Sequence, residues 1–298
     1  MNRALRMGFS VVGAGLLPLL AGCATTTETG GGGDVAPNPY ATLDQLTGNQ
    51  TFQSAQVRVQ RDAAGAVGAT GAESFGNGIA LSYDAAADSY TVSNAGTKLD
   101  SFAPSDLQAS STSSSRVYQK TAGSGTAALT VARGVVGGVP LSYTQFTTYV
   151  AADATGQRQW ISVGGQPTLG PDMPTAGTGT YTTAVSGTVV RDGKTYVAPA
   201  ASSTATFTAD FGARTVATTV HLIGSLPTTP ETTVDFGTVT GAGVIERNAS
   251  GFTGAFTGTT GAGFAGVFTG SAAQEMGYVF SYGKGADQVT GTVAGRKN

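Results

Sequence analysis

The chain has 298 residues, a formal net charge of −2 and only 11% charged residues. An acidic chain with no basic cluster lacks the electrostatic attraction on which binding to nucleic acid or to anionic lipid depends, so we expect no nucleic-acid partner. Its single cysteine, Cys23, excludes internal disulfides, so packing and backbone pairing must hold the fold.

The first segment of the chain has the form of a bacterial lipoprotein signal. Arg3 and Arg6 precede an apolar run over residues 8–20, which is too short to cross a bilayer as a helix. Small residues lead up to Cys23 in the sequence LAGC. We interpret residues 1–22 as a signal peptide and Cys23 as the acylated, palmitate-bearing first residue of the mature protein. The alternative is an ordinary secretory signal with a chance cysteine.

Residues 23–39 predict a flexible tether that begins at the lipidated cysteine. They contain four consecutive glycines and show no apolar periodicity. A flexible segment of this length holds a folded domain about 20–25 Å from the lipid. Ala24 provides no acidic retention signal, so we expect an outer-membrane lipoprotein that faces the cell exterior.

From Tyr40 onward, short alternating runs separated by turn residues predict an all-β chain. A hairpin is expected from residues 79–83 and 89–92, and further strands at residues 116–119, 127–133, 141–150 and 159–163. Trp160, the only tryptophan, is expected to anchor a core rather than to serve as a ligand platform. The Ser-rich residues 100–115 predict a loop.

The second half of the chain alternates aromatic residues with glycine along single strand faces. Phe252, Gly254 and Phe256 share one face, and Phe264, Gly266 and Phe268 share another. Large and small residues in turn suit the tapered interior of a small closed barrel. Eight or nine strands are expected between residues 177 and 297. The residues expected to be buried inside are Phe207, Phe211, Phe252, Phe256, Phe264, Phe268 and Phe280.

Several of these segments together resemble one known family. They are GQPT at 165–168, MPTAGTGTY at 173–181, ATFTADF at 205–211, GFAGVFTG at 263–270, AQEMGYVF at 273–280 and VAGRK at 293–297. In combination they resemble the transferrin-binding-protein-like surface lipoproteins, which include transferrin receptors and complement-factor-binding lipoproteins. The resemblance implies an eight-stranded antiparallel β-barrel over residues 173–298, preceded by a β-rich, handle-like domain over residues 40–172.

The resemblance also implies a function. It predicts a lipid-anchored binding protein that captures a nutrient or host-derived ligand, either a haem or iron source or a protein, with an uptake receptor or host protein as partner. The connections between strands lack the long insertions that protein-binding lobes of this family use, which argues against direct binding of transferrin. The alternative is a structural or protective envelope lipoprotein that captures no ligand.

The residues offer little for catalysis, so we expect no enzyme, no metal and no cofactor. His221 is the only histidine, and no nucleophile-elbow pattern surrounds a serine. We expect His221 to be a strand residue with a local hydrogen bond; the open alternative is an axial haem ligand, a role that a tyrosine could also fill. Any ligand site is expected in the first half, near residues 110–115, Tyr118, Tyr143 and Tyr149, or on loops at one end of the barrel.

Overall fold

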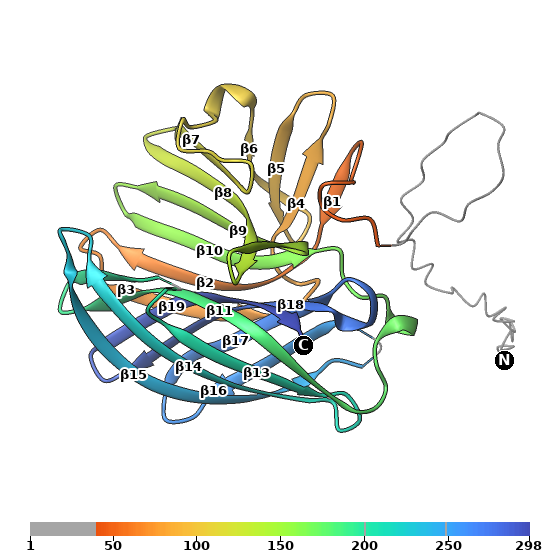
Figure 1. Ribbon diagram of the computed structural model, residues 1–298. Helices are drawn as coiled ribbons and strands as arrows, with labels where there is room; N and C mark the ends of the chain where they lie inside the picture. Colours follow the sequence, from red (N-terminus) through yellow and green to blue (C-terminus); the bar gives the residue numbers. More distant parts are fainter. Residues whose placement is uncertain (1–39, 200, 248) are drawn as a thin grey trace, which may run out of the picture. The chain divides into compact units, whose positions relative to one another are not determined.

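Three antiparallel sheets make up the residues that the computed structural model describes, which are 40–199, 201–247 and 249–298 (Figure 1). The all-β prediction is confirmed. The predicted signal peptide (residues 1–22), the lipidated Cys23 and the tether (residues 23–39) lie outside these residues. All described residues belong to one unit. None of the helices within the described ranges has the length and hydropathy needed to span a membrane.

The first half of the chain forms a sandwich of two sheets. One has four strands in the order β1–β4–β5–β6, and the other has six in the order β3–β2–β10–β9–β8–β7. The four-stranded sheet contains β1 (Gln50–Phe52), β4 (Ala80–Asp84), β5 (Ser89–Asn94) and β6 (Thr97–Phe102). The six-stranded sheet contains β2 (Ser54–Asp62), β3 (Val67–Glu73), β7 (Ser115–Ala122), β8 (Gly125–Val136), β9 (Val139–Asp153) and β10 (Gly156–Gly165). The predicted hairpin is the β4–β5 pair.

Aromatic side chains form the core between these two sheets. Trp160 is 6% exposed and stacks on Tyr149 with ring centroids 5.2 Å apart, so it is the core anchor that the sequence predicted. Phe102 and Tyr118 are fully buried in the same core. The predicted Ser-rich loop contains the end of β6 and a short 3-10 helix, η1 (Pro104–Asp106), and it leads to β7.

The second half closes into a barrel. Its nine-stranded sheet is β12–β11–β13–β14–β15–β16–β17–β18–β19, and the additional β11–β19 pairing closes a ring of eight strands, with β12 at the margin. The ring strands are β11 (Thr178–Arg191), β13 (Thr204–Asp210), β14 (Thr215–Leu226), β15 (Thr229–Ile245), β16 (Gly251–Phe256), β17 (Thr260–Thr269), β18 (Glu275–Lys284) and β19 (Asp287–Lys297). The short β12 (Lys194–Ala198) pairs with β11 and β14. The predicted eight-stranded barrel is therefore confirmed.

Aromatic rings fill the barrel interior, as the alternation with glycine predicted. All seven of the phenylalanines that the sequence assigned to the interior are buried there. The rings of Phe252 and Phe268 lie 4.9 Å apart, between centroids. A Cβ atom at Gly254 would lie 2.2 Å from the ring of Phe264, and one at Gly266 would lie 2.4 Å from the ring of Phe252. Glycine is therefore needed at both positions because a neighbouring ring occupies the side-chain space.

The six-stranded sheet packs against the outside of the barrel. Its β2 and β10 contribute Ala55, Val57, Ile161 and Val163, which cluster with Ala265, Val267 and Val279 on the outer faces of β17 and β18. These two barrel strands are thus buried on both faces, and this explains why their sequences carry so few polar residues. This contact was not predicted from the sequence.

A buried carboxylate fastens the same contact. Glu275, at the start of β18, is 3% exposed. Its Oε1 accepts a hydrogen bond from the backbone N–H of Ser142 (2.7 Å), and its Oε2 accepts one from the N–H of Tyr143 (2.8 Å). The hydroxyl of Thr144 also donates to Oε2 at 3.2 Å. One barrel side chain therefore satisfies two consecutive backbone donors of β9.

The segment that connects the sandwich to the barrel is hydrogen-bonded at both of its ends. The N–H of Thr168 donates to the carbonyl of Phe268 at 2.9 Å, and its hydroxyl donates to the carbonyl of Gly270 at 2.6 Å. A short 3-10 helix, η2 (Gly170–Asp172), follows. The hydroxyl of Tyr40 donates to Asp172 Oδ2 at 2.6 Å and accepts from the N–H of Leu169 at 3.0 Å. The start of the described chain is thus attached to this connection.

Candidate functional site

The barrel interior is occupied by the chain's own side chains. The hydroxyl of Tyr278, at the centre of the aromatic cluster, forms a 2.6 Å hydrogen bond with the hydroxyl of Thr218. Tyr181 donates to the carbonyl of Ala273 at 2.7 Å. Burial raises the pKa of both phenols far above their usual range, so they stay neutral and structural. With the buried cluster around them, these bonded pairs make the barrel interior a packed core, and the candidate pocket lies outside it.

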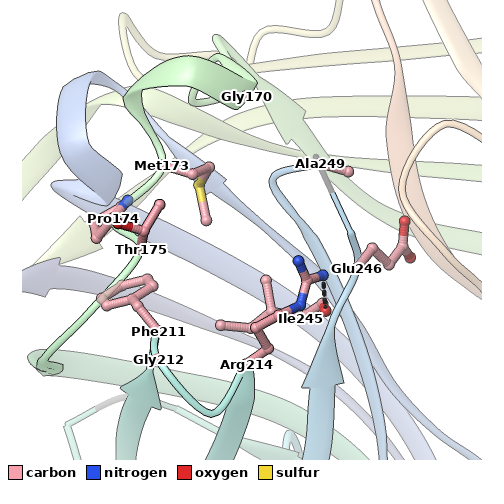
Figure 2. Close-up of a pocket in the computed structure, with 10 residues that line it drawn as sticks. All are labelled: Gly170, Met173, Pro174, Thr175, Phe211, Gly212, Arg214, Ile245, Glu246 and Ala249. Carbon is pink, nitrogen blue, oxygen red and sulfur yellow. Dashed lines mark hydrogen bonds between the residues drawn. The ribbon is translucent and has the colours of Figure 1, made fainter.

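A pocket of about 160 Å³ lies at the end of the barrel where the chain arrives from the sandwich (Figure 2). Three separate segments line it, and each is a connection rather than a strand interior. The segment after η2 supplies Met173, Pro174 and Thr175; the β13–β14 turn supplies Phe211, Gly212 and Arg214; and the β15–β16 turn, with the end of β15, supplies Ile245, Glu246 and Ala249. The pocket therefore sits on loops at one end of the barrel.

Arg214 brings a positive charge to this pocket. Its Nη2 donates to the carbonyl of Ile245 at 2.5 Å, and the N–H of Ile245 donates to the carbonyl of Arg214 at 2.9 Å. The backbone of Arg214 has a φ of 57°, which is uncommon for a residue other than glycine. Figure 2 shows the side chains of Met173 and Arg214 pointing toward one another from opposite walls, while the Glu246 carboxylate points away.

The floor of the pocket is aromatic. Phe211 is only 4% exposed, and the Lys297 ammonium lies 5.1 Å from its ring centroid. A guanidinium, a thioether and an aromatic ring around a small opening can hold a compact ligand group that carries negative charge. From the sequence, Phe211 was predicted as a core residue and Met173 lies in a segment that carries the family resemblance, whereas Arg214 was not predicted. The available signal was an arginine in the tight turn between two strands, at the end of DFGAR.

His221 lies on the outer face of the barrel. Its Nε2 forms a 2.8 Å hydrogen bond with Asp235 Oδ1 on the neighbouring β15, while Val220 and Leu222 are fully buried on the other face. The backbone N–H of Gly237 and then His221 hold the pKa of Asp235 below its usual value. The prediction of a strand histidine with a local hydrogen bond is confirmed. Across the described ranges, no group of three or more His, Cys, Asp or Glu side chains could hold a metal ion.

The first-half aromatics expected near a ligand divide into two kinds. Tyr118 and Tyr149 are buried in the sandwich core, because alternation along β7 and β9 directs them inward, so they are not available to a ligand. Tyr143 remains partly exposed. The Ser-rich residues 110–115 lie mostly at the surface. Of the three tyrosines, Tyr143 alone remains a candidate for ligand contact.

A charged cluster lies at one end of the sandwich. Arg116 donates two 3.0 Å hydrogen bonds to the Asp88 carboxylate, and the Tyr83 hydroxyl donates to the same carboxylate at 2.9 Å. The guanidinium lies 5.7 Å from the Tyr90 ring centroid and 5.6 Å from that of Tyr118. The hydrogen bond from Arg116 lowers the pKa of Asp88. The Arg116 guanidinium and the Asp88 carboxylate bind each other, so this cluster joins β5, β7 and the β4–β5 turn.

The sequence of the barrel matches a known family. Residues 173–297 match the model described as the C-lobe and N-lobe beta barrels of Tf-binding protein B. The second half of this chain is a transferrin-binding-protein-like barrel. No curated protein matches the chain.

Several solved structures are similar to this chain at low sequence identity. Transferrin Binding Protein B from Haemophilus parasuis Hp5, as a double mutant, is 11% identical over 85% of this chain and 76% of its own, with a TM-score of 0.42. HpuA from Kingella denitrificans, in complex with human haemoglobin, is 13% identical over 87% and 90%, with a TM-score of 0.40. The N-lobe of Lactoferrin Binding Protein B of Moraxella bovis is 14% identical over 82% and 99%, with a TM-score of 0.35.

Proposed function

We propose that this protein is a lipid-anchored outer-membrane binding protein that captures a nutrient or host-derived ligand at the cell exterior, without catalysis. The observation that carries the proposal is the transferrin-binding-protein-like barrel of residues 173–297, together with the lipoprotein signal that ends at Cys23. The barrel acts as a rigid scaffold, and its interior side chains stabilise it. The ligand would therefore be bound by loops, because recognition residues usually lie on the loops of such scaffolds.

We propose the pocket around Arg214 as the capture site on the barrel. It combines a cation with apolar walls, and it is formed by connections at the end of the barrel where the sandwich joins. Tyr143 of β9 lies beside the same connection, since its carbonyl accepts a 2.9 Å hydrogen bond from the N–H of Gln166, and it extends the proposed surface. The predicted bounds of the two domains, residues 40–172 and 173–298, remain part of this proposal.

Anchoring is tested with Cys23→Ala. The acyl chains on Cys23 are the membrane anchor in this proposal, so the variant is expected to leave the membrane fraction and to lose metabolic labelling by palmitate. The wild type is expected to be labelled and to be cleaved when intact cells are treated with protease. An unlabelled wild type would contradict the lipoprotein assignment, and complete protection from protease would place the protein on the periplasmic side.

Capture is tested with the chain that begins at residue 24, which avoids the lipid. Haem, haemoglobin, transferrin and lactoferrin form the ligand panel. Binding that weakens in Arg214→Gln, but not in Arg247→Gln on the exposed side of the next turn, supports the proposed site. No binding of any of these ligands would favour the alternative, a structural or protective envelope lipoprotein.

A further inference from the structure

A second hollow lies where the six-stranded sheet and the barrel wall separate. On the barrel-facing side of β2, Ala55 and Val57 pack against the barrel, but Arg61, further along the same face, does not. On β10 the same face changes from Val163 and Ile161 to Gln159 and Gln157. The register aligns these changes, because Gln159 pairs with Val59 and Gln157 with Arg61. The dry contact therefore ends in a polar groove.

The opposite wall of this groove is the outer face of the barrel. Thr188 and Val190 of β11 face it, and they pair in register with Thr290 and Gln288 of β19. The groove has a volume of about 580 Å³ and is open to solvent. This volume lies within the range of pockets that bind small molecules, about 300–1,000 Å³. The β2–β3 turn and the β11–β12 turn, with Asp192, form its rim.

Arg61 is the only cationic side chain in the lining of the groove. Burial lowers the pKa of its guanidinium, because the surrounding sheet removes part of its hydration. Within the described part of the chain its side chain has no hydrogen bond or ion pair. Arg116, Arg133 and Arg191, by contrast, each bind an aspartate. A partly buried, unpaired guanidinium is costly, and a bound anion would offset that cost.

Asp192 on the rim is the one carboxylate in the lining, and the remaining polar groups of the groove are neutral. Gln157, Gln159 and Gln288 supply amides, each with two donors and an acceptor, and Thr188 and Thr290 supply hydroxyls. None of these side chains is hydrogen-bonded to another described residue. Amides and hydroxyls match the donor and acceptor pattern of vicinal hydroxyl groups, whereas the planar guanidinium matches a carboxylate. The set therefore favours a ligand that carries both kinds of group.

We propose that this groove binds an acidic saccharide, with Arg61 holding the carboxylate and the three glutamine amides holding the ring hydroxyls. The site is separate from the Arg214 pocket and does not depend on the proposed capture function. The saccharide would lie between the sandwich and the barrel, so both halves of the chain contribute to its recognition.

The test is a calorimetric titration of the full-length chain in detergent with digalacturonic acid, with the galactose disaccharide of the same linkage, and with acetate. We expect digalacturonic acid to bind, and the neutral disaccharide and acetate each to bind at least about tenfold more weakly. Arg61→Gln should weaken binding of the acid by at least about tenfold. Gln159→Leu should weaken binding of the disaccharides while leaving any binding of acetate unchanged.

Arg158→Gln is the matched control. Arg158 is exposed and lies between Gln157 and Gln159 on the opposite face of β10, so this change keeps the wild-type affinity. Unchanged thermal unfolding of each variant confirms that it is folded. Absence of digalacturonic acid binding, or full binding by Arg61→Gln, would overturn the proposal. Acetate or the neutral disaccharide binding as tightly as the acid would overturn the assignment to acidic saccharides.

Discussion

Side chains alternate between the two faces of each barrel strand, and the two faces differ in packing. The inner face is filled, whereas the outer face packs against the six-stranded sheet over only part of its length. Inside the barrel, the aromatic side chains pack against one another, such as Phe207 against Phe252 at 5.1 Å between ring centroids. Outside it, the six-stranded sheet and the barrel wall touch along Val57 and Val267 and then separate at Arg61. Closure of the sheet fills space, whereas divergence of two sheets leaves it open. The Arg214 pocket and the groove at Arg61 therefore both lie outside the barrel interior.

The largest effect is expected inside the barrel. Phe252→Ala removes a fully buried ring from the aromatic cluster, and the rigid strands around it cannot collapse into the cavity. The free energy of unfolding should fall by about 3–5 kcal/mol. Urea denaturation measures it, with Thr232→Ala on the exposed part of β15 as the control, which should change stability by less than about 0.5 kcal/mol. A loss below about 1 kcal/mol would mean that the interior is loosely packed.

The carboxylate that joins the barrel to β9 comes next. Glu275→Ala leaves the N–H groups of Ser142 and Tyr143 without their acceptor, and the expected loss is about 2–4 kcal/mol. Glu275→Gln should lose less, because its amide oxygen still accepts one of these bonds. Glu231→Ala, an exposed glutamate on β15, is the control and should be neutral. Equal stability of Glu275→Ala and Glu231→Ala would show that the buried carboxylate does not fasten the two halves.

Val279→Thr, on the outer wall of the barrel, should destabilise the whole chain but improve the solubility of the isolated barrel. Val279→Thr buries a hydroxyl against the six-stranded sheet, so in the whole chain it should cost about 1–3 kcal/mol. In residues 173–298 alone, the same face meets water, so Val279→Thr should improve solubility, as seen by gel filtration. This experiment also tests the predicted autonomy of the barrel. An isolated barrel that does not fold in either form would refute that autonomy.

The smallest effect concerns the charged cluster at the end of the sandwich. Because Arg116 lowers the pKa of Asp88, the ionised carboxylate stabilises the folded state above its unfolded pKa of about 4, and this contribution is lost as the pH falls through the folded pKa. Asp88→Asn should therefore flatten the fall in urea midpoint between about pH 5 and pH 3. Glu231→Gln serves as the reference. Identical pH profiles for Asp88→Asn and the wild type would contradict the expectation.

The barrel could be predicted from the sequence because the alternation of aromatic residues and glycine is visible within each strand. The spacing of Phe264, Gly266 and Phe268 is enough to place them on one face of a strand, and the same pattern repeated along the chain predicts a closed barrel. His221 was placed correctly for the same reason, since Val220 and Leu222 mark the inner face. Its hydrogen-bond partner Asp235 could not be foreseen, because it depends on the register between β14 and β15.

Contacts between distant segments escaped prediction. β17 and β18 look like ordinary barrel strands, and only the structure shows why Val267 and Val279 are apolar on their outer side. The pairing of Glu275 with β9 joins residues more than 130 positions apart. Arg214 and Arg61 were both missed, because a lone arginine carries no signal until the surface opposite it is known. Strands β1, β2, β3 and β6 were also missed, since their runs are short or interrupted by charge.

The hydrogen bonds of the Tyr40 hydroxyl with Asp172 and Leu169 determine where a pulling force on the N-terminus would enter the folded chain. If the chain is held by its N-terminus, tension enters the described part at Tyr40. It passes directly to the connection, and through Thr168 to the carbonyl of Phe268 at the end of β17. The N–H of Leu43 also donates to the carbonyl of Ser142 in β9 at 2.8 Å, so part of this tension reaches the six-stranded sheet before it reaches strand β1.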